Sequence, residues 1–263
     1  MEKIIVVKSG GDIATGIAHR LFRSGFFVVI TEIAQPTVIR RTVSFAEAVY
    51  AGTVVIEGVA AKRTELSDVN RCLNARMIPV VVDPHADCIA ELKPWAVVDA
   101  ILAKQNTGTS IQDAALVIGV GPGFTAGQDV HAVIETMRGH DLGRVITSGT
   151  AQPNTGVPGA IGGYTTERVL RAPVAGVFEG VCRIGDLAAR GDIIGWIGPE
   201  PVYATIDGIL RGLLQDGLQV DKGMKIGDID PRCQPENCLT ISDKARAVGG
   251  GVLEALLWLG AII

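Results

Sequence analysis

Apolar residues near the start of the chain fall into short continuous runs separated by a segment with helical spacing. A run at residues 4–7 leads into Ser9-Gly10-Gly11, and residues 12–23 then place apolar side chains at 13, 17, 21 and 22. A second run at 26–30 ends at Glu32. This order predicts a strand, a tight turn, a helix and a second strand, which together form the β-α-β unit typical of dinucleotide-binding domains.

The glycine turn is the first candidate for a ligand site. A phosphate binds the bare N–H groups at a helix N-terminus only where no Cβ blocks it, and Gly10 and Gly11 meet that condition. Glu32 stands where an acid would bind a ribose, and Asp12 and Thr15 lie in the first turn of the helix. We assign these five residues to cofactor binding. Two points count against nucleotide binding here. Asp12 would repel a pyrophosphate, and the glycines can instead allow the helix to pack on its strand.

Strand and helix patterns continue to alternate beyond the second run. We expect strands at 53–59, 77–83, 96–100 and 114–120, a helix at 65–75 and a short helical pattern within 36–50. Such alternation predicts a parallel sheet covered by helices. Ligands of open sheets bind beyond the carboxyl ends of strands, where Asp83-Pro84-His85 and Asp99 fall. For His85 we favour a role in the turn alone. For Asp99, ligand binding and local capping both stay open.

A second glycine loop follows the strand at 114–120. Gly121 and Gly123 can present backbone N–H groups to an anion, and we assign them to cofactor binding. Asp129 and His131 follow, and we propose them as catalytic acid or base. The spacing of apolar residues at 132–137 suggests a short helix. A lone histidine is also commonly structural. As metal ligands the two residues would need partners from elsewhere in the chain, because residues spaced i, i+2 cannot share one helical face, and we assign no metal site.

An internal repeat occupies residues 168–231. Glycines at 176, 180, 185, 191 and 195 recur 32 residues later, at 208, 212, 217, 223 and 227. Short β runs surround them, so we expect two halves that interlock as a small all-β sandwich. The segment resembles the biotinyl and lipoyl carrier fold, the barrel-sandwich hybrid. The junction at 197–202 has no lysine, and we therefore expect neither biotin nor lipoate.

The last 30 residues predict a helix that packs back on the first domain. Ser242 is a suitable N-cap. The apolar stretch at 252–263 is about 12 residues long and is interrupted by Glu254, so it is too short to cross a membrane. Cys238 precedes the helix, and Lys244 and Arg246 can lower its pKa. We propose Cys238 as a reactive thiol, and a buried, inert cysteine is the alternative.

Composition narrows the class of protein. The chain has 263 residues, a formal net charge of −4, 5% aromatic and 20% charged residues. It therefore offers neither a basic face nor stacking platforms, which disfavours nucleic acid as a partner. Irregularly spaced cysteines and the lack of an apolar leader indicate a cytoplasmic protein with free thiols and no membrane partner. Homo-oligomerisation stays open.

Several long segments together resemble one family. They are VKSGGDIATGIAHRLFRSGF, IRRTVSFAEAVYAG, VVDAILAK, GVGPGFTAGQDVHAVIETMRGHDLGRVI and CLTISDKARAVGGGVLEALL. They resemble the YqeB-type selenium-dependent molybdenum hydroxylase system proteins. The resemblance implies an accessory role in maturing such a hydroxylase, with the hydroxylase or other maturation proteins as partners. Ser9 departs from the triple glycine usual in that family.

The fold class expected from these patterns is α/β. A Rossmann-like domain would span residues 1–165, a barrel-sandwich module 166–231, and a C-terminal helix 232–263. The leading hypothesis is a maturation factor that binds a nucleotide such as NAD(P), or a molybdopterin cofactor, at the first glycine turn. One alternative is a non-catalytic docking scaffold or chaperone. Another is an NAD(P)-dependent oxidoreductase, although the sequence has no evident hydride-transfer pair.

Overall fold

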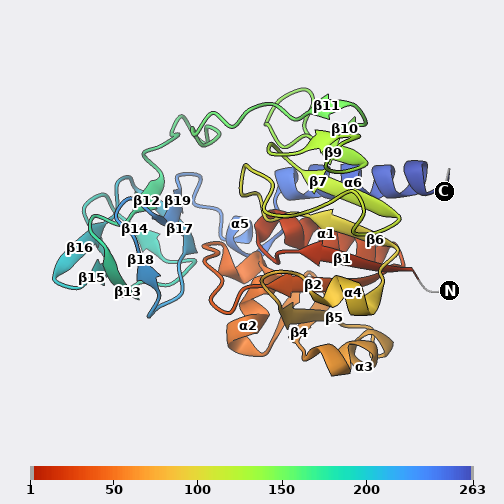
Figure 1. The fold of residues 1–263 in the computed structure, drawn as a ribbon. Helices are drawn as coiled ribbons and strands as arrows, with labels where there is room; N and C mark the ends of the chain where they lie inside the picture. Colours follow the sequence, from red (N-terminus) through yellow and green to blue (C-terminus); the bar gives the residue numbers. More distant parts are fainter. Residues whose placement is uncertain (1–2, 262–263) are drawn as a thin grey trace. The chain divides into compact units, whose positions relative to one another are not determined.

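The computed structural model describes residues 3–261 and divides the chain into two compact units (Figure 1). The first unit contains the described residues of Met1–Pro36, Ser44–Thr155 and Ile241–Ile263. The second contains Thr37–Val43 and Gly156–Thr240. The chain therefore enters the second unit twice, once briefly after β2 and once for the repeat region.

A nine-stranded sheet forms the centre of the first unit. Its order is β10-β9-β7-β6-β1-β2-β5-β4-β3, and only the outermost strands, β3 and β10, run antiparallel to their neighbours. The large parallel sheet predicted from the alternating pattern is thus confirmed. The strands are β1 (Ile4–Lys8), β2 (Phe27–Glu32), β3 (Thr53–Ile56), β4 (Val59–Arg63), β5 (Ile78–Val82), β6 (Ala96–Asp99), β7 (Leu116–Val120), β9 (Ala132–Ile134) and β10 (Val145–Ile146).

The order in which strands are added to the sheet changes direction at β1. Strand β2 pairs on one side of β1 and strand β6 on the other, both in parallel. Such a reversal leaves a crevice at the carboxyl ends of the two strands, since the connections leave them toward opposite faces. Lys8 ends β1 and Asp99 ends β6, and the two residues are direct partners in the register.

Helices cover both faces of this sheet. Alternate residues of β1 separate the two cores: Ile5 and Val7 pack with α1 (Asp12–Arg23) and α6 (Asp243–Gly260), whereas Val6 packs with α3 (Val69–Asn74) and α4 (Cys88–Leu92). The predicted C-terminal helix is confirmed, and the predicted N-cap also holds, since Ser242 Oγ accepts the Ala245 N–H at 3.2 Å.

Three local predictions differ from the structure. The single strand expected at 53–59 is instead the antiparallel hairpin of β3 and β4, which turns at Glu57 and Gly58, both with positive φ. The short helical pattern within 36–50 forms only η1 (Arg41–Val43), η2 (Phe45–Glu47) and the single turn α2 (Ala48–Ala51). The helix expected at 132–137 is wrong: Ala132–Ile134 form β9, parallel to β7. All three residues of β9 are fully buried in the sheet, where pairing outweighs the weak helical spacing. A small ladder of β8 (Thr125–Ala126) and β11 (Gly149–Thr150) completes the unit.

The second unit contains the repeat. Its two four-stranded sheets have the orders β12-β19-β17-β14 and β16-β15-β13-β18. Shifting each strand of the first copy by 32 residues gives its counterpart in the second, and this exchange converts one sheet order into the other. The strands are β12 (Val169–Arg171), β13 (Gly176–Gly180), β14 (Leu187–Ala188), β15 (Ile193–Ile197), β16 (Glu200–Tyr203), β17 (Gly208–Leu213), β18 (Gln219–Val220) and β19 (Lys225–Asp230), followed by α5 (Glu236–Leu239).

Both copies contribute two strands to each sheet, so neither copy could bury its apolar face alone. The repeated glycines mark the turns: Gly185 and its counterpart Gly217 adopt φ of 103° and 80°, and Gly191 and Gly223 adopt 96° and 84°. These values lie in the left-handed region, which favours glycine because it has no Cβ.

Candidate functional site

The first glycine turn is closed by the acid at the end of β2. Glu32 Oε1 accepts the Gly10 N–H at 2.9 Å and the Ser9 hydroxyl at 3.2 Å, and its Oε2 accepts the Ile33 N–H at 2.7 Å. The structure therefore brings Glu32 to the turn, as the sequence suggested. Its carboxylate, however, occupies the Gly10 N–H that was expected to bind a phosphate.

A short segment of the chain packs on the other side of Gly10. The Ala46 N–H donates to the Gly10 carbonyl at 2.9 Å, and a Cβ on Gly10 would lie 2.7 Å from Ala46 N. Thr15 joins the two: its hydroxyl donates to the Gly10 carbonyl at 2.9 Å and accepts the Phe45 N–H at 2.8 Å. In this structure Gly10 and Thr15 serve backbone packing, and Gly11 donates its N–H to Ser9 Oγ at 3.2 Å.

A half-buried lysine at the start of α6 lies within electrostatic reach of the first turn of α1. Burial holds the pKa of Lys244 below its usual range and the Arg138 charge acts in the same direction, while Asp12, Glu135 and Asp243 oppose the shift. Asp12 therefore faces a cation as well as the helix N-terminus. That arrangement lessens the repulsion of an anion expected from Asp12 alone.

The ends of β1 and β6 carry a buried polar network at the point where the strand order reverses. Lys8 Nζ donates to Thr109 Oγ1 at 2.7 Å, Thr109 Oγ1 donates to Asp99 Oδ2 at 2.6 Å, and Lys8 and Asp99 form an ion pair at 3.7 Å. All three residues are at most 6% exposed. From the sequence, the role of Asp99 stayed open, and Lys8 and Thr109 were not identified. A lysine at the end of an apolar strand could have indicated a functional position.

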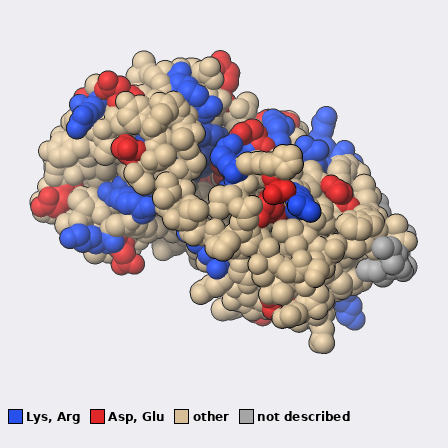
Figure 2. Space-filling view, turned by 90° about the horizontal axis from the view of Figure 1, so that it is seen from above, with Lys and Arg blue, Asp and Glu red and all other residues tan. Residues whose placement is uncertain are grey.

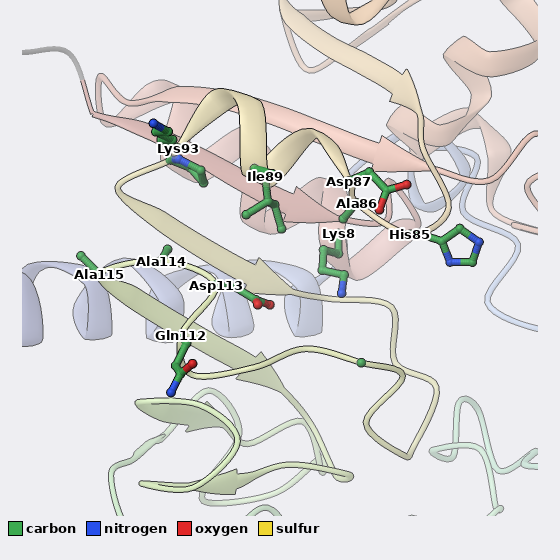
Figure 3. Close-up of a pocket in the computed structure, with 13 residues that line it drawn as sticks. Lys8, His85, Ala86, Asp87, Ile89, Lys93, Gln112, Asp113, Ala114 and Ala115 are labelled. Atoms are coloured by element: carbon green, nitrogen blue, oxygen red, sulfur yellow. The ribbon is translucent and has the colours of Figure 1, made fainter.

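Lys8 also lines a groove of about 640 Å³ beside α4. Figure 3 shows Lys8 between α4 and the segment that carries Gln112 and Asp113, with His85 toward one end of the groove and Lys93 toward the other. Its lining carries charges of both signs. The lining residues are Lys8, His85, Ala86, Asp87, Ile89, Ala90, Lys93, Pro94, Gly108, Gln112, Asp113, Ala114 and Ala115.

Asp83, near the same groove, has a structural role. Its carboxylate accepts the N–H groups of Asp87 at 3.0 Å and Cys88 at 2.8 Å, at the start of α4. Burial alone would raise the pKa of Asp83, but the hydrogen bonds of this turn outweigh burial and hold it below its usual value. This is the turn chemistry expected for Asp83-Pro84-His85, and it leaves His85 on the groove.

Asp129 and His131, proposed as catalytic acid or base, each accept a hydrogen bond from a different backbone N–H. Asp129 accepts the Thr125 N–H at 2.7 Å, and His131 Nδ1 accepts the Val117 N–H at 3.0 Å. Val117 lies at the amino end of β7, whereas Gly121 and Gly123 follow its carboxyl end, roughly 13 Å along the strand. His131 is thus separated from both glycines. A Cβ on Gly123 would lie 2.6 Å from Gln105 N, so close backbone packing explains that glycine.

Cys238 lies in the second unit, whereas the other candidate residues lie in the first. The thiol is 1% exposed, and burial raises its pKa. The charges of Arg211 and Arg40 only partly counter this effect, and Asp230 adds to it. The lowered pKa expected from Lys244 and Arg246 is therefore wrong, because burial, rather than neighbouring cations in the sequence, determines the thiol's environment.

One face of the molecule can be compared with the charge composition. On the face shown in Figure 2, acidic and basic side chains are interspersed and form no continuous field of one sign. Among residues 3–261, no helix is long and apolar enough to cross a membrane. The same residues contain no group of three or more histidine, cysteine or acidic side chains placed to hold a metal ion.

Comparison with solved structures yields distant likenesses. An aspartoacylase family protein from Mesorhizobium loti is 10% identical, with a TM-score of 0.27 over 86% of this chain and 84% of its own. A succinylglutamate desuccinylase/aspartoacylase from Rhodobacter sphaeroides is 15% identical, with a TM-score of 0.27 over 87% and 85%. Likenesses at this level carry no argument about function.

Comparison with curated sequences gives a close match. No protein-family model matches the chain. Uncharacterized protein YqeB of Escherichia coli (strain K12) is 54% identical over 259 residues, which cover 98% of this chain and 48% of YqeB. The chain therefore spans about half the length of this relative. At such identity the two sequences are homologous, which supports a YqeB-type family for the protein.

Proposed function

We propose that the protein is a cytoplasmic accessory factor in the maturation of a selenium-dependent molybdenum hydroxylase. In this proposal a Rossmann-like first domain binds a nucleotide or a molybdopterin-type cofactor, and the repeat region is a barrel-sandwich module. The homology to YqeB supports a YqeB-type family, and the resemblance of the long sequence segments to that family is the basis of the proposed biological role. The geometry of the first unit supports the binding role.

One observation carries the binding proposal: a buried ammonium group lines a groove at the reversal point of the sheet. Lys8 has three N–H donors, of which Thr109 engages one at 2.7 Å, while Asp99 lies at 3.7 Å. The groove's volume of about 640 Å³ falls within the range of small-molecule sites. A phosphate of the ligand would accept from Lys8, while Thr109 and Asp99 hold the ammonium in position.

This proposal places the ligand in the groove lined by Lys8 and not on the glycine turn that follows β1. Gly10 already donates its N–H to Glu32, whereas Lys8 retains donor capacity and reaches the groove. The lining also contains Asp87 and Asp113, which can accept hydrogen bonds from ribose, amine or pterin groups. Charges of both signs suit a ligand with an anionic end and a hydrogen-bond-donating end.

Calorimetric titration of the full chain with NAD(P), ATP, CTP and molybdopterin species tests the proposal. We expect one of these to bind, and Lys8→Gln to weaken it about 10-fold or more, since a charge-assisted hydrogen bond contributes roughly 1.5–3 kcal/mol. Lys62→Gln, which removes the charge of an exposed lysine on β4 outside the groove, is the control. Absence of binding by every compound would overturn the cofactor role. The NAD(P) titration also tests the oxidoreductase alternative.

A second candidate, a docking scaffold, is favoured by apolar side chains on the second unit. Val177 and Val181 are 44% and 59% exposed, whereas their repeat counterparts Ile209 and Leu213 are 1% and 2% exposed. The two positions are therefore apolar in both copies of the repeat, but they are buried in the second copy and exposed in the first. Clusters of exposed apolar residues mark interaction surfaces.

Co-purification with a molybdenum hydroxylase distinguishes the two candidates. A scaffold would lose its partner in Val177→Lys/Val181→Lys and keep it in Lys8→Gln. Leu257→Lys, at a 57% exposed position on α6, is the control for adding a charge to an apolar surface residue.

A further inference from the structure

A small pocket in the first unit is lined by basic side chains from two helices. His19, Arg20 and Arg23 belong to α1 and Arg246 belongs to α6, around a cavity of about 260 Å³. The remaining lining residues are Gly16, Ser24 and Ile241. The pocket shares no residue with the groove that contains Lys8.

Close helix packing brings the basic residues together. A Cβ on Gly16 would lie 2.7 Å from the Ala245 Cβ, so only glycine allows α6 to approach α1 this closely. Arg246 follows Ala245 directly and is thereby held beside α1. Its Nη2 donates to both carboxylate oxygens of Glu57, at 2.6 and 2.8 Å, which fixes the guanidinium at the pocket.

The positive charge of the pocket is only partly balanced. Glu57 is engaged by Arg246 and by the Ile241 N–H at 2.8 Å. Within residues 3–261, the side chains of Arg20 and Arg23 form no hydrogen bond or ion pair. The last turn of a helix favours cations, which accounts for basic residues at the end of α1. It does not account for a third guanidinium from another helix converging on the same cavity.

We propose that this pocket binds the phosphoryl group of a small molecule. Guanidinium groups pair with phosphate oxygens through charge-assisted hydrogen bonds, and a tetrahedral dianion can accept from several of them at once. A planar carboxylate carries one charge and would satisfy fewer donors. Arg20 and Arg23 supply the free donors, while Arg246, held by Glu57, adds positive charge. The cavity volume suits a phosphoryl group and a few further atoms.

Titration of the full chain with pyrophosphate and with ribose 5-phosphate, followed by ¹H–¹⁵N NMR and calorimetry, tests the site. Sodium chloride at matched ionic strength controls for screening. We expect saturable shifts of the Gly16 and Ser24 amides. Arg20→Gln/Arg23→Gln should weaken binding about 10-fold or more, because two charge-assisted contacts are lost. Glutamine keeps helix propensity close to that of arginine, and an unchanged circular dichroism spectrum verifies the fold.

Arg183→Gln/Arg190→Gln is the matched control, since it removes the same charge from two exposed residues of the second unit. Equal weakening by both double variants, or no saturable binding by either probe, would overturn the proposal. The Gly16 and Ser24 amides report on this pocket alone, because neither residue lines the groove that contains Lys8. The pocket and the proposed cofactor groove are therefore tested separately.

Discussion

Glu32 Oε1 lies 2.9 Å from the backbone nitrogen of Gly10 and accepts its hydrogen bond. This contact ties the end of β2 to the turn after β1, and the second carboxylate oxygen accepts the Ile33 N–H at 2.7 Å. The acid is 8% exposed, so both backbone donors depend on it rather than on water. Glu32 therefore has a structural role whether or not a ligand binds beside it.

Replacing Glu32 with glutamine should destabilise the protein. The amide can accept from only one of the two backbone N–H groups, and its NH₂ faces the other donor. We expect a loss of about 1–3 kcal/mol in the free energy of unfolding, measured by urea titration. Glu254→Gln, at an exposed position on α6, should change stability by less than about 0.5 kcal/mol. Equal effects would contradict the structural role.

Adjacent glycines of α6 should respond oppositely to alanine. A Cβ on Gly251 would lie 2.0 Å from the Gly143 carbonyl oxygen, whereas on Gly250 the nearest atom, from the flexible Arg20 side chain, is 4.0 Å away. Gly250→Ala should therefore stabilise the protein by about 0.5–1 kcal/mol, the usual gain from replacing a helical glycine. Gly251→Ala should destabilise it by at least 1–3 kcal/mol, roughly the cost of overpacking. Thermal denaturation of both variants measures the difference.

The buried pair at the end of β1 and β6 should show strong coupling. Lys8→Met leaves Asp99 buried without its cation and should cost about 3–5 kcal/mol. The double variant Lys8→Met/Asp99→Leu should recover most of that loss, since neither charge remains. For comparison, Arg144→Gln in the exposed Arg144–Asp141 pair should cost at most about 1 kcal/mol. Additive losses at Lys8 and Asp99 would show that the two side chains do not interact.

Thiol labelling should separate the cysteines by burial. Burial, followed by the hydrogen bond and charge of Asp83, raises the pKa of Cys88 to about 12, and burial also raises the pKa of Cys238. Few thiolates form at either residue near pH 8, so iodoacetamide should modify the exposed Cys233 first. Peptide mass spectrometry after timed labelling measures the order. Rapid labelling of Cys238 in the folded protein would restore its proposed chemical role.

The Glu57–Arg246 contact should make stability depend on pH in the acid range. Burial alone would raise the pKa of Glu57, but the Arg246 and Ile241 hydrogen bonds and the charges of Arg246 and His19 together hold it below its usual value. A lowered carboxyl pKa adds stability that is complete above the unfolded-state value and is lost as pH falls through the folded-state value. The difference in stability between the native chain and Glu57→Gln should thus be greatest near neutral pH and should be lost as the pH falls through the lowered folded-state pKa. A difference that persists at pH 2 would be contrary to this assignment.

Local pattern alone determined several features of this protein. Continuous apolar runs separated by helical spacing predicted the parallel sheet, because strands buried on both faces need apolar residues at every position. The offset of 32 residues predicted two interlocking copies, and Ser242 predicted the start of α6. These features depend on residues that are close in the sequence, so they can be predicted from the sequence alone.

The chemical environment of the candidate site depended on tertiary structure. Lys8 meets Asp99 because β6 pairs beside β1, and Gly10 is required because Ala46 packs on it. His131 is turned away from the glycine loop because the chain runs back to the amino end of β7 before β9 begins. Each of these contacts joins residues whose separation in the sequence does not reveal their distance in space. Strand order and burial decided which donors were occupied and which cations faced a cavity.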